Sequence, residues 1–322
     1  MIPNRSLDAQ RWDAFIESSP QGSLYLRYDY ASLLFEEWEA LIVREEDTWL
    51  AVMPLARSER LGFRRVLQPV LAQHWGLCFV PAEDRPYREY LSLKRQVIIK
   101  ACEAFDRADI CLIHFSPEFD YGLPFHWAGF ELRTRYTYWL ELDAPPAVLF
   151  HRLADPLRRQ VRKTERNHLE VRIVSDPTGF LDLVHQNRLR GHDVLGGNVR
   201  AKNLLPHLCK LLTDKGWGEI LELRTASGDL HAALLLGRHR DHSLYLLGAY
   251  HPEQAQSGAM SRLMWEAIAH AALRGDHIFD FEGSMIEGVE DFFRKFGARP
   301  VPYLQIRRNR LPFFLQWIPG LQ

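Results

Sequence analysis

The sequence has few cysteines and no long apolar run. Its four cysteines are scattered over 322 residues without any C-x-x-C spacing, which argues against a disulfide framework and fits a reducing compartment. No segment approaches the roughly 20 apolar residues that a membrane-spanning helix needs, and the first fifteen residues hold no apolar stretch long enough for a secretory signal. We therefore expect a cytoplasmic protein with no transmembrane segment.

Neither sign of charge dominates the sequence. Forty Lys and Arg residues balance 41 Asp and Glu residues, so the formal net charge is -1. Such a balance gives no global field for DNA, and any anion site has to be local. Hydrophobic residues make up 47% and charged residues 25%, which is typical of a globular protein. The length is that of about two average domains.

Several catalytic signatures are absent. The sequence contains no G-x-S-x-G, no H-E-x-x-H, no G-x-x-x-x-G-K-[ST] and no Cys/His cluster with zinc spacing. These absences argue against serine-hydrolase, metalloprotease and P-loop chemistry. The fourteen histidines are scattered, so we interpret them as surface or capping groups and expect no metal site.

The order of predicted elements is repeated along the chain. The first half shows short helical patterns at 7–17 and 29–37, then strand-like runs, a long helix from about residue 87 and strands at 109–115 and 135–142. The turn at residues 45–47 predicts a hairpin. Paired prolines at 145–146 suggest the boundary between two domains, because they stop a strand.

The second half repeats helices, an antiparallel meander, a long helix and a strand. Predicted helices lie at about 155–168, 177–190, 201–214, 258–274 and 288–296. We therefore predict an α/β fold with mixed sheets, made of two similar lobes at 1–144 and 145–310 with a ligand cleft between them. A final apolar tail covers 311–322.

The tail follows three arginines and contains two prolines, which disfavour a regular amphipathic helix. We favour docking of the tail onto the protein body over contact with a membrane, because its aromatic residues would otherwise form an exposed patch. These residues are Phe313, Phe314 and Trp317.

A basic helix is predicted to begin at Asp155 and Pro156, where the carboxylate caps the helix and proline takes its first position. Five cations recur on adjoining faces of this helix, a pattern that suits phosphate or another polyanion. The alternative is a solvated helix face. The five cations are Arg158, Arg159, Arg162, Lys163 and Arg166.

The helix predicted at 258–274 carries an apolar stripe that belongs in a core. A polar turn precedes it and contains Gln254, Ser257 and Gly258. Free N–H groups at this helix start could hold a pyrophosphate, which makes the turn a candidate donor site.

The stretch FDFEGSMIEGVEDFFRKFGA at 279–298 holds the candidate catalytic residues. A strand runs out after Asp280 and Glu282, which alternation places on one side of it. We assign Asp280 or Glu282 to orient or deprotonate an acceptor amine, and Arg294 or nearby backbone N–H groups to stabilise an oxyanion. The alternative is an aromatic-anchored helix packed after a sheet strand.

Three segments resemble the Fem-type peptidyltransferases, a double-GNAT family that adds amino acids to peptidoglycan precursors from aminoacyl-tRNA. They are LRRQVRKTERNHLEV at 157–171, FDFEG at 279–283 and GVEDFFRKFGA at 288–298. The resemblance implies two tandem GNAT-like lobes of the acyl-CoA N-acyltransferase fold. It also places Gln73, His74 and Trp75 where the first lobe of such enzymes lines the acceptor groove.

The resemblance implies an N-acyltransferase that acts on an amine of a phosphate-bearing or cell-envelope precursor. The family has a lysine where this sequence has Phe293, so acyl-CoA and aminoacyl-tRNA both remain as donors, and tRNA as a partner. No covalently bound cofactor is expected. The alternatives are an acyl-CoA-dependent N-acetyltransferase acting on a sugar or small amine, and a non-catalytic binding module with the GNAT fold.

Overall fold

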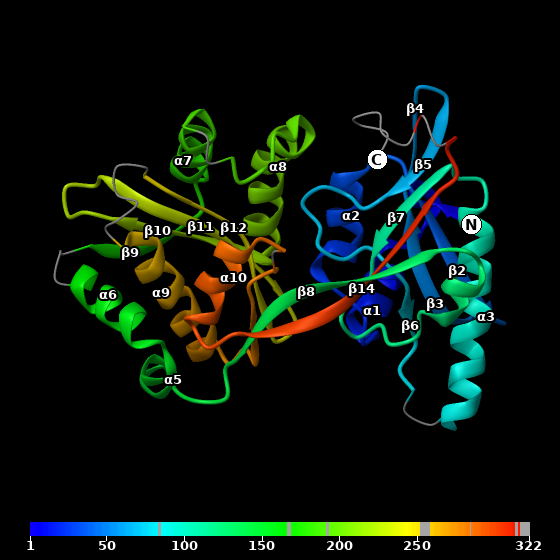
Figure 1. The fold of residues 1–322 in the computed structure, drawn as a ribbon, viewed down its shortest axis with the longest axis horizontal. Helices are drawn as coiled ribbons and strands as arrows, with labels where there is room; N and C mark the ends of the chain where they lie inside the picture. The colour runs from blue at the N-terminus through cyan, green and yellow to red at the C-terminus, as the bar shows by residue number, and fades with distance from the viewer. Residues whose placement is uncertain are drawn as a thin grey trace. The chain divides into compact units, whose positions relative to one another are not determined.

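A computed structural model describes residues 1–82, 85–165, 169–190, 193–251, 258–283, 285–312 and 315. The chain divides into two compact units, one of Met1–Arg135 with Pro302–Gln322 and one of Tyr136–Val301 (Figure 1). We call them the N-terminal and C-terminal units. Their limits differ from the predicted lobes because two long strands, β8 (Glu131–Glu141) and β14 (Arg299–Asn309), run from one unit into the other.

The N-terminal unit contains a four-stranded sheet in the order β1-β2-β3-β6. Antiparallel pairing of β2 and β3 around the turn at Glu46, whose φ is 50°, confirms the predicted hairpin. A second group of strands runs β4, β5, β7 and the end of β14. The strands are β1 (Ile2–Pro3), β2 (Glu39–Glu45), β3 (Thr48–Leu55), β4 (Arg57–Arg60), β5 (Phe63–Leu67), β6 (Cys78–Phe79) and β7 (Ile110–His114).

The described residues of this unit form four α-helices and two short 3-10 helices. Asp8 caps the first α-helix by accepting from the N–H groups of Gln10 and Arg11 at 3.0 Å. The long helix buries one face, including Val97 and Phe105. The helices are α1 (Ala9–Ser18), α2 (Tyr28–Leu34), α3 (Tyr87–Phe105), α4 (Leu123–Trp127), η1 (Asn4–Ser6) and η2 (Leu24–Leu26).

The start of the tail packs within this unit. Leu311 is buried against Ile110, while Leu315 contacts the same cluster. Arg308 lies with its guanidinium 4.1 Å above the ring of Phe130. Phe313, Phe314 and Trp317, on which the docking prediction depends, lie outside the described residues.

The C-terminal unit has one mixed sheet in the order β8-β13-β12-β11-β10-β9. The meander of β10, β11 and β12 is antiparallel, β12 and β13 are parallel, and β13 is antiparallel to β8. The strands not yet bounded are β9 (Glu170–Val174), β10 (Gly218–Arg224), β11 (Leu230–His239), β12 (His242–Tyr250) and β13 (Ile278–Asp280).

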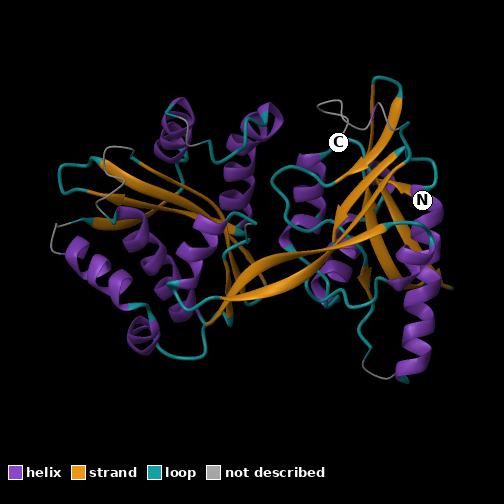
Figure 2. Cartoon of the chain, viewed as in Figure 1, coloured by secondary structure: helices purple, strands orange, loops and turns teal. Residues whose placement is uncertain are grey.

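Helices cover both faces of this sheet (Figure 2). Helix α9 packs on one face with α5, α6 and α10 near it, and α7 and α8 pack on the other. Gly216 and Gly275 end α8 and α9 in the left-handed conformation, as the sequence predicts for Gly275. The helices are α5 (Pro146–Arg152), α6 (Asp155–Glu165), α7 (Thr178–Leu189), α8 (Val199–Lys215), α9 (Ala259–Arg274) and α10 (Glu287–Arg294).

Candidate functional site

The sheet of the C-terminal unit loses a strand pairing at its centre. Strands β12 and β13 pair over only three residues, the last pair being Leu244 with Asp280. β13 ends there, whereas β12 continues beside β11 to Tyr250 and contains one extra residue, Leu246, at a bulge. The edge of β12 beyond Leu244 therefore has no strand beside it among those described.

Tyr245 lies along this unpaired part of β12. A Cβ atom at Gly248 would come within 2.2 Å of the Tyr245 hydroxyl, so glycine is needed for the ring to lie there. The ring also packs edge-on against Phe293 of α10, with centroids 6.3 Å apart. Burial, and secondly the charge of Glu282, raise the pKa of Tyr245. The hydroxyl is therefore protonated at neutral pH and can donate a hydrogen bond.

Asp280 is buried and holds β13 to β8. Its carboxylate accepts hydrogen bonds from Thr137 Oγ1 at 2.5 Å, from Trp139 Nε1 at 2.9 Å and from the backbone N–H of Glu282 at 2.8 Å. Burial raises the pKa of Asp280 to about 6, although the three hydrogen bonds favour the charged form. These contacts make Asp280 a positioning group, and its predicted catalytic role stays a prediction.

Glu282 follows the end of β13 in a left-handed conformation, with φ of 57°. Strand alternation therefore does not reach Glu282, because the strand ends at Asp280. Next to it, Gly283 has φ of 53°, and a Cβ there would lie 2.2 Å from the carbonyl oxygen of Tyr136. The half-buried Glu282 carboxylate is thus placed close enough to Tyr245 to act on its pKa.

Helix α10 covers this region with aromatic rings. Phe293 is buried and packs 4.8 Å from the ring of Phe281 and 5.9 Å from that of Tyr138. Arg294 points the other way, since its side chain is 66% exposed and donates to Asp291 at 2.9 Å. The structure does not bring Arg294 together with the two acidic residues, and its predicted oxyanion role remains untested.

The basic helix α6 begins at Asp155 as predicted. Two of its arginines have partners within the unit: Arg158 binds Asp155 and donates to the carbonyl oxygen of His151, and Arg162 lies 5.4 Å over the ring of Phe150. These contacts turn two of the predicted anion-binding groups toward their own helix and the preceding one.

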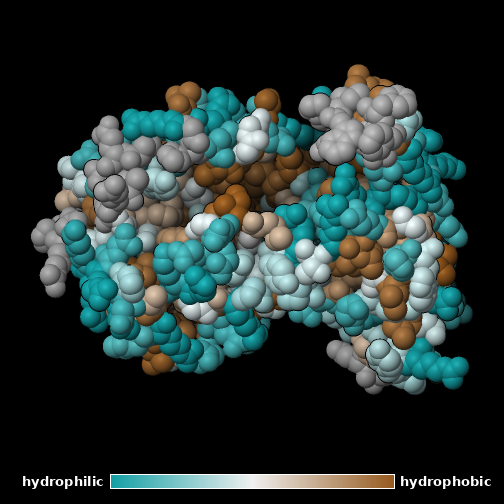
Figure 3. Space-filling view, viewed as in Figure 1, coloured by the Kyte–Doolittle hydropathy of each residue, from teal (hydrophilic) through white to brown (hydrophobic). Residues whose placement is uncertain are grey.

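The remaining cations of α6 divide into two groups. Arg159 and Lys163 are exposed and make no ion pair with any residue that the structure describes, and the surface over α6 is mainly hydrophilic (Figure 3). Arg166 lies outside the described residues. Anion binding by α6 therefore rests on Arg159 and Lys163, and it stays a prediction.

The candidate donor turn is described only at its last residue. Gly258 precedes α9 with φ of 82°, and a Cβ there would meet the Gln160 side chain at 2.5 Å. Gln160 also accepts from the Ser261 hydroxyl at 3.1 Å, which joins α6 to the start of α9. Gln254 and Ser257 lie outside the described residues.

The three residues predicted to line an acceptor groove are buried within the N-terminal unit. Gln73, His74 and Trp75 are each at most 9% exposed. The His74 ring packs edge-on against Tyr303 at 5.0 Å. Burial, together with the nearby His114, lowers the pKa of His74 to about 3, so the ring is neutral. The predicted role in substrate binding is not tested by these contacts.

Asn187 of α7 is a site residue that sequence reasoning missed. The Asn187 side chain faces the backbone of Tyr250 on β12. The next residue of the chain, His251, donates its backbone N–H to the carbonyl oxygen of His231 at 2.7 Å. Because an antiparallel ladder alternates, the backbone groups of Tyr250 point away from β11. When the side-chain amide of Asn187 is turned so that both contacts are hydrogen bonds, its nitrogen donates to the Tyr250 carbonyl oxygen at 2.6 Å. Its oxygen accepts from the Tyr250 backbone N–H at 3.3 Å.

Nothing in the sequence marks Asn187, because a polar residue inside a predicted helix normally faces solvent. Tyr245 was equally hidden as one aromatic residue of a strand. Within the ranges that the structure describes, no three His, Cys, Asp or Glu side chains gather where they could hold a metal ion. None of the described helices combines the length and apolar character needed to cross a membrane.

The C-terminal unit matches a known family. Residues 152–294 match the profile of a domain described as an acetyltransferase (GNAT) domain. This range includes the meander, α9, the end of β13 and α10. No curated protein matches the sequence.

Solved structures share the fold of the whole chain. FemX matches with a TM-score of 0.70 at 15% identity, covering 97% of this chain and 98% of that one. L-PGS from Bacillus licheniformis matches at 0.58 and 14% identity, with coverage of 96% and 94%. A tandem GNAT protein from the clavulanic acid biosynthesis pathway matches at 0.52 and 14% identity, with coverage of 85% and 83%.

These matches confirm the predicted mixed α/β fold with two GNAT-like lobes. They agree with the family match at 152–294 and with the resemblance of the segment at 279–298 to the Fem-type family. Residues 152–294 of the C-terminal unit thus match a GNAT acetyltransferase domain, and the chain as a whole has the fold that FemX and the tandem GNAT protein share.

Proposed function

We propose that the C-terminal unit catalyses N-acyl transfer, with Glu282 and Tyr245 as the reacting protein groups. The observation that supports this proposal is that Glu282 follows the end of β13 and its charge raises the pKa of Tyr245 on the unpaired part of β12, within the range that matches the GNAT domain. An amide product requires an amine to attack an activated carbonyl, so the site needs a proton acceptor and a proton donor.

Each group suits one half of this chemistry. The Glu282 carboxylate accepts the proton that the acceptor amine loses as its nitrogen forms the new bond to the acyl carbon. The Tyr245 hydroxyl, protonated at neutral pH, donates its proton to the leaving sulfur or oxygen as the bond between that atom and the acyl carbon breaks. Asp280 holds the backbone of Glu282, which positions the carboxylate.

Acyl-CoA is the donor that we favour. Phe293, at the position of the Fem-type lysine, is a buried ring packed on Phe281, and Arg294 turns away to Asp291. This part of the site therefore offers no cation for an aminoacyl-tRNA reaction. The unpaired backbone edge of β12 instead suits the amide groups of an extended pantetheine chain.

An aminoacyl donor is the second candidate. It is favoured by the exposed Arg159 and Lys163 of α6, which are suited to phosphates, and by the shared fold with FemX. We propose an amine of a phosphate-bearing or cell-envelope precursor as acceptor, because the fold is shared with FemX and L-PGS. The free, buried cysteines fit a reaction in a reducing cytoplasm.

The test compares Glu282→Gln and Tyr245→Phe with wild type in an acyl-transfer assay on an amine panel. We expect kcat to fall by about 100-fold in each variant, the usual contribution of a general acid or base, while the coenzyme A Kd is retained. Glu287→Gln changes an exposed acidic residue of α10 and serves as the matched control. Full turnover in both variants would exclude this assignment.

A thermal shift experiment identifies the donor. Coenzyme A should raise the Tm of the chain, because a ligand that binds the folded state stabilises it. Transfer from aminoacyl-tRNA without any coenzyme A effect would favour the second candidate. Ligand binding without transfer to any amine of the panel would favour a non-catalytic module.

A further inference from the structure

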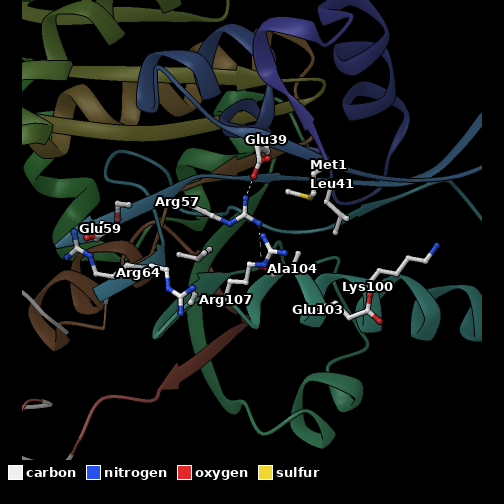
Figure 4. Close-up of a pocket in the computed structure, with 14 residues that line it drawn as sticks. Met1, Glu39, Leu41, Arg57, Glu59, Arg64, Lys100, Glu103, Ala104 and Arg107 are labelled. Carbon is white, nitrogen blue, oxygen red and sulfur yellow. Dashed lines mark hydrogen bonds and ion pairs between the residues drawn. The ribbon is translucent and has the colours of Figure 1, made fainter. Parts of the chain in front are cut away.

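The N-terminal unit contains a cavity of about 940 Å³ that the proposed reaction does not use. Strands β2, β4 and β5 and helix α3 line it (Figure 4). Ligand sites commonly have volumes of roughly 300–1,000 Å³, so the cavity can hold a whole organic molecule. Its apolar lining consists of Met1, Leu41, Val66, Ala104 and Ala108.

Two arginines meet at one side of the cavity. Arg57 comes from β4 and Arg107 follows the end of α3, and their side chains reach toward one another (Figure 4). Burial, and secondly the charge of Arg107, lower the pKa of Arg57. Two like charges at this spacing repel each other, and an anion bound between them would remove that cost.

The chain itself neutralises only one of these two arginines. Arg57 binds the carboxylate of Glu39 and donates to the carbonyl oxygen of Ala104 at 3.4 Å. Arg107 makes no ion pair with any carboxylate in the described part of the chain, although Glu103 lies one turn before it on α3. The guanidinium of Arg107 therefore keeps its donors for a ligand.

The other charged side chains that line the cavity also favour an anionic ligand. The lining contains five cations against three carboxylates, an excess of two positive charges. Arg64 is only loosely engaged, with its Nε 3.7 Å from Asp109. The cations are Arg57, Arg64, Arg65, Lys100 and Arg107, and the carboxylates are those of Glu39, Glu59 and Glu103.

We propose that this cavity binds an amphipathic anion, with a phosphate or carboxylate head between Arg57 and Arg107 and an apolar chain or ring along Leu41, Val66 and Ala108. A guanidinium pair matches the planar, multidentate geometry of such a head group. The apolar lining gives the rest of the ligand a surface to bury. All lining residues belong to the N-terminal unit, whereas Glu282 and Tyr245 belong to the C-terminal unit.

The experiment measures binding of monododecyl phosphate, below its micelle concentration, to the full chain by calorimetry. Inorganic phosphate supplies the head alone, and dodecyl maltoside supplies the chain without the anion. We expect monododecyl phosphate to bind at least about tenfold more tightly than either, because each covers only half of the site. Equal binding of inorganic phosphate and monododecyl phosphate would overturn the apolar half of the proposal.

Arg107→Ala tests the anionic half. Arg107 is exposed and has no ion pair to lose, so the fold should persist while affinity for monododecyl phosphate falls about tenfold, as expected for a charge-assisted pair. Lys100→Ala is the matched control, because Lys100 lines the same cavity but points away from the arginine pair (Figure 4). Unchanged affinity in Arg107→Ala, or an equal loss in Lys100→Ala, would overturn the proposal.

Two further measurements test the apolar contact and show whether the ligand comes from a lipid or from solution. Ala104→Phe should fill the cavity and weaken monododecyl phosphate while leaving inorganic phosphate unchanged. Co-sedimentation with phosphatidylcholine vesicles, with and without phosphatidic acid, shows whether the head group is taken from a lipid. Sedimentation that depends on phosphatidic acid and Arg107 indicates a lipid ligand, and its absence alongside binding of monomeric ligand indicates a soluble one.

Discussion

The two units use the same order of elements and fill the equivalent region differently. In the N-terminal unit, the strand after the long helix is β7, and Trp75 donates its backbone N–H to His114 at the end of that strand at 2.7 Å. A Cβ at Gly76 would meet the Phe115 ring at 2.5 Å. The Phe115 ring thus packs directly against the backbone of Gly76, and Trp75 is fully buried beside it.

In the C-terminal unit, the strand after the long helix is β13, which stops while β12 continues. The polar groups of this region are the Tyr245 hydroxyl on β12, the Glu282 carboxylate after the end of β13, whose charge raises the pKa of Tyr245, and the Asn187 amide bound to Tyr250. Aromatic rings pack in both regions, but in the C-terminal unit they lie beside a strand edge that has no strand partner among those described. The difference argues for chemistry in the C-terminal unit, because function depends on the site and not on the fold.

The largest effect should come from the turn that places Glu282. Gly283→Ala would put a Cβ 2.2 Å from the Tyr136 carbonyl oxygen in a left-handed backbone, so we expect the free energy of unfolding to fall by about 3 kcal/mol. Urea unfolding measures this. Gly288→Ala is the control, since nothing lies within 4 Å of its Cβ. A stable Gly283→Ala protein would mean that the turn adapts and does not fix Glu282.

The buried histidine of the N-terminal unit should make stability depend on pH. His74 has a pKa of about 3 when folded, against about 6.5 in an unfolded chain. The unfolded state therefore takes up the proton first, and stability falls as pH drops below 6.5. At pH 4.5 the loss from His74 should be about 2–3 kcal/mol relative to neutral pH.

His74→Phe removes this contribution without removing a hydrogen bond of normal geometry in the described part of the chain. Urea titrations from pH 4.5 to 7.5 should show a smaller slope in the variant, while His114, whose pKa burial lowers to about 4, keeps its own share. Acyl transfer at pH 7.5 should be unchanged. A loss of transfer would contradict the assignment of chemistry to the C-terminal unit alone, because it would show that the region around His74 contributes to the reaction.

Asn187→Ala should have a smaller effect on stability and a local one on β12. The variant loses two buried hydrogen bonds to Tyr250, so the free energy of unfolding should fall by about 1–3 kcal/mol. Hydrogen exchange should speed up at the Tyr250 amide. Asn203→Ala, an exposed asparagine of α8, is the control. An unchanged exchange rate at Tyr250 would show that Asn187 does not hold this edge.

Arg294→Ala should have the smallest effect. Its side chain is 66% exposed and binds Asp291 on the same helix, and exposed pairs of this kind contribute little to stability because solvent screens them. We expect turnover to stay within about threefold of wild type, less than the loss of one oxyanion donor. A fall of about 100-fold would instead restore Arg294 to the catalytic group and place the oxyanion site on α10.

Much of the fold could be read from local patterns. The strand predicted at 135–142 is β8 at Glu131–Glu141, and the helix predicted at 288–296 is α10 at Glu287–Arg294. Short pieces such as β4 and α4 were missed, because four or five residues carry too little periodicity to identify an element. Strand β5 ends at Leu67, shortly before Pro69, which cannot donate to a ladder.

The candidate site was predicted less completely than the fold. Sequence reasoning found Asp280 and Glu282 because two acidic residues at a strand end are unusual in an aromatic-rich stretch. It did not separate their roles, since those depend on Thr137 and Trp139, which lie more than 100 residues away in the chain. The arginine pair at Arg57 and Arg107 was hidden for the same reason.

The sequence by itself determined the repeated order of helices and strands, the start of α6 at Asp155, the end of α9 at Gly275 and the GNAT-like character of 279–298. These features are encoded by neighbours within one or two turns or by alternation along a strand. Tertiary structure alone decided that β12 extends beyond the end of β13 and that Tyr245 lies over Gly248, where the charge of Glu282 raises its pKa. Strand partners and side-chain neighbours come from distant parts of the chain, so no local pattern records them.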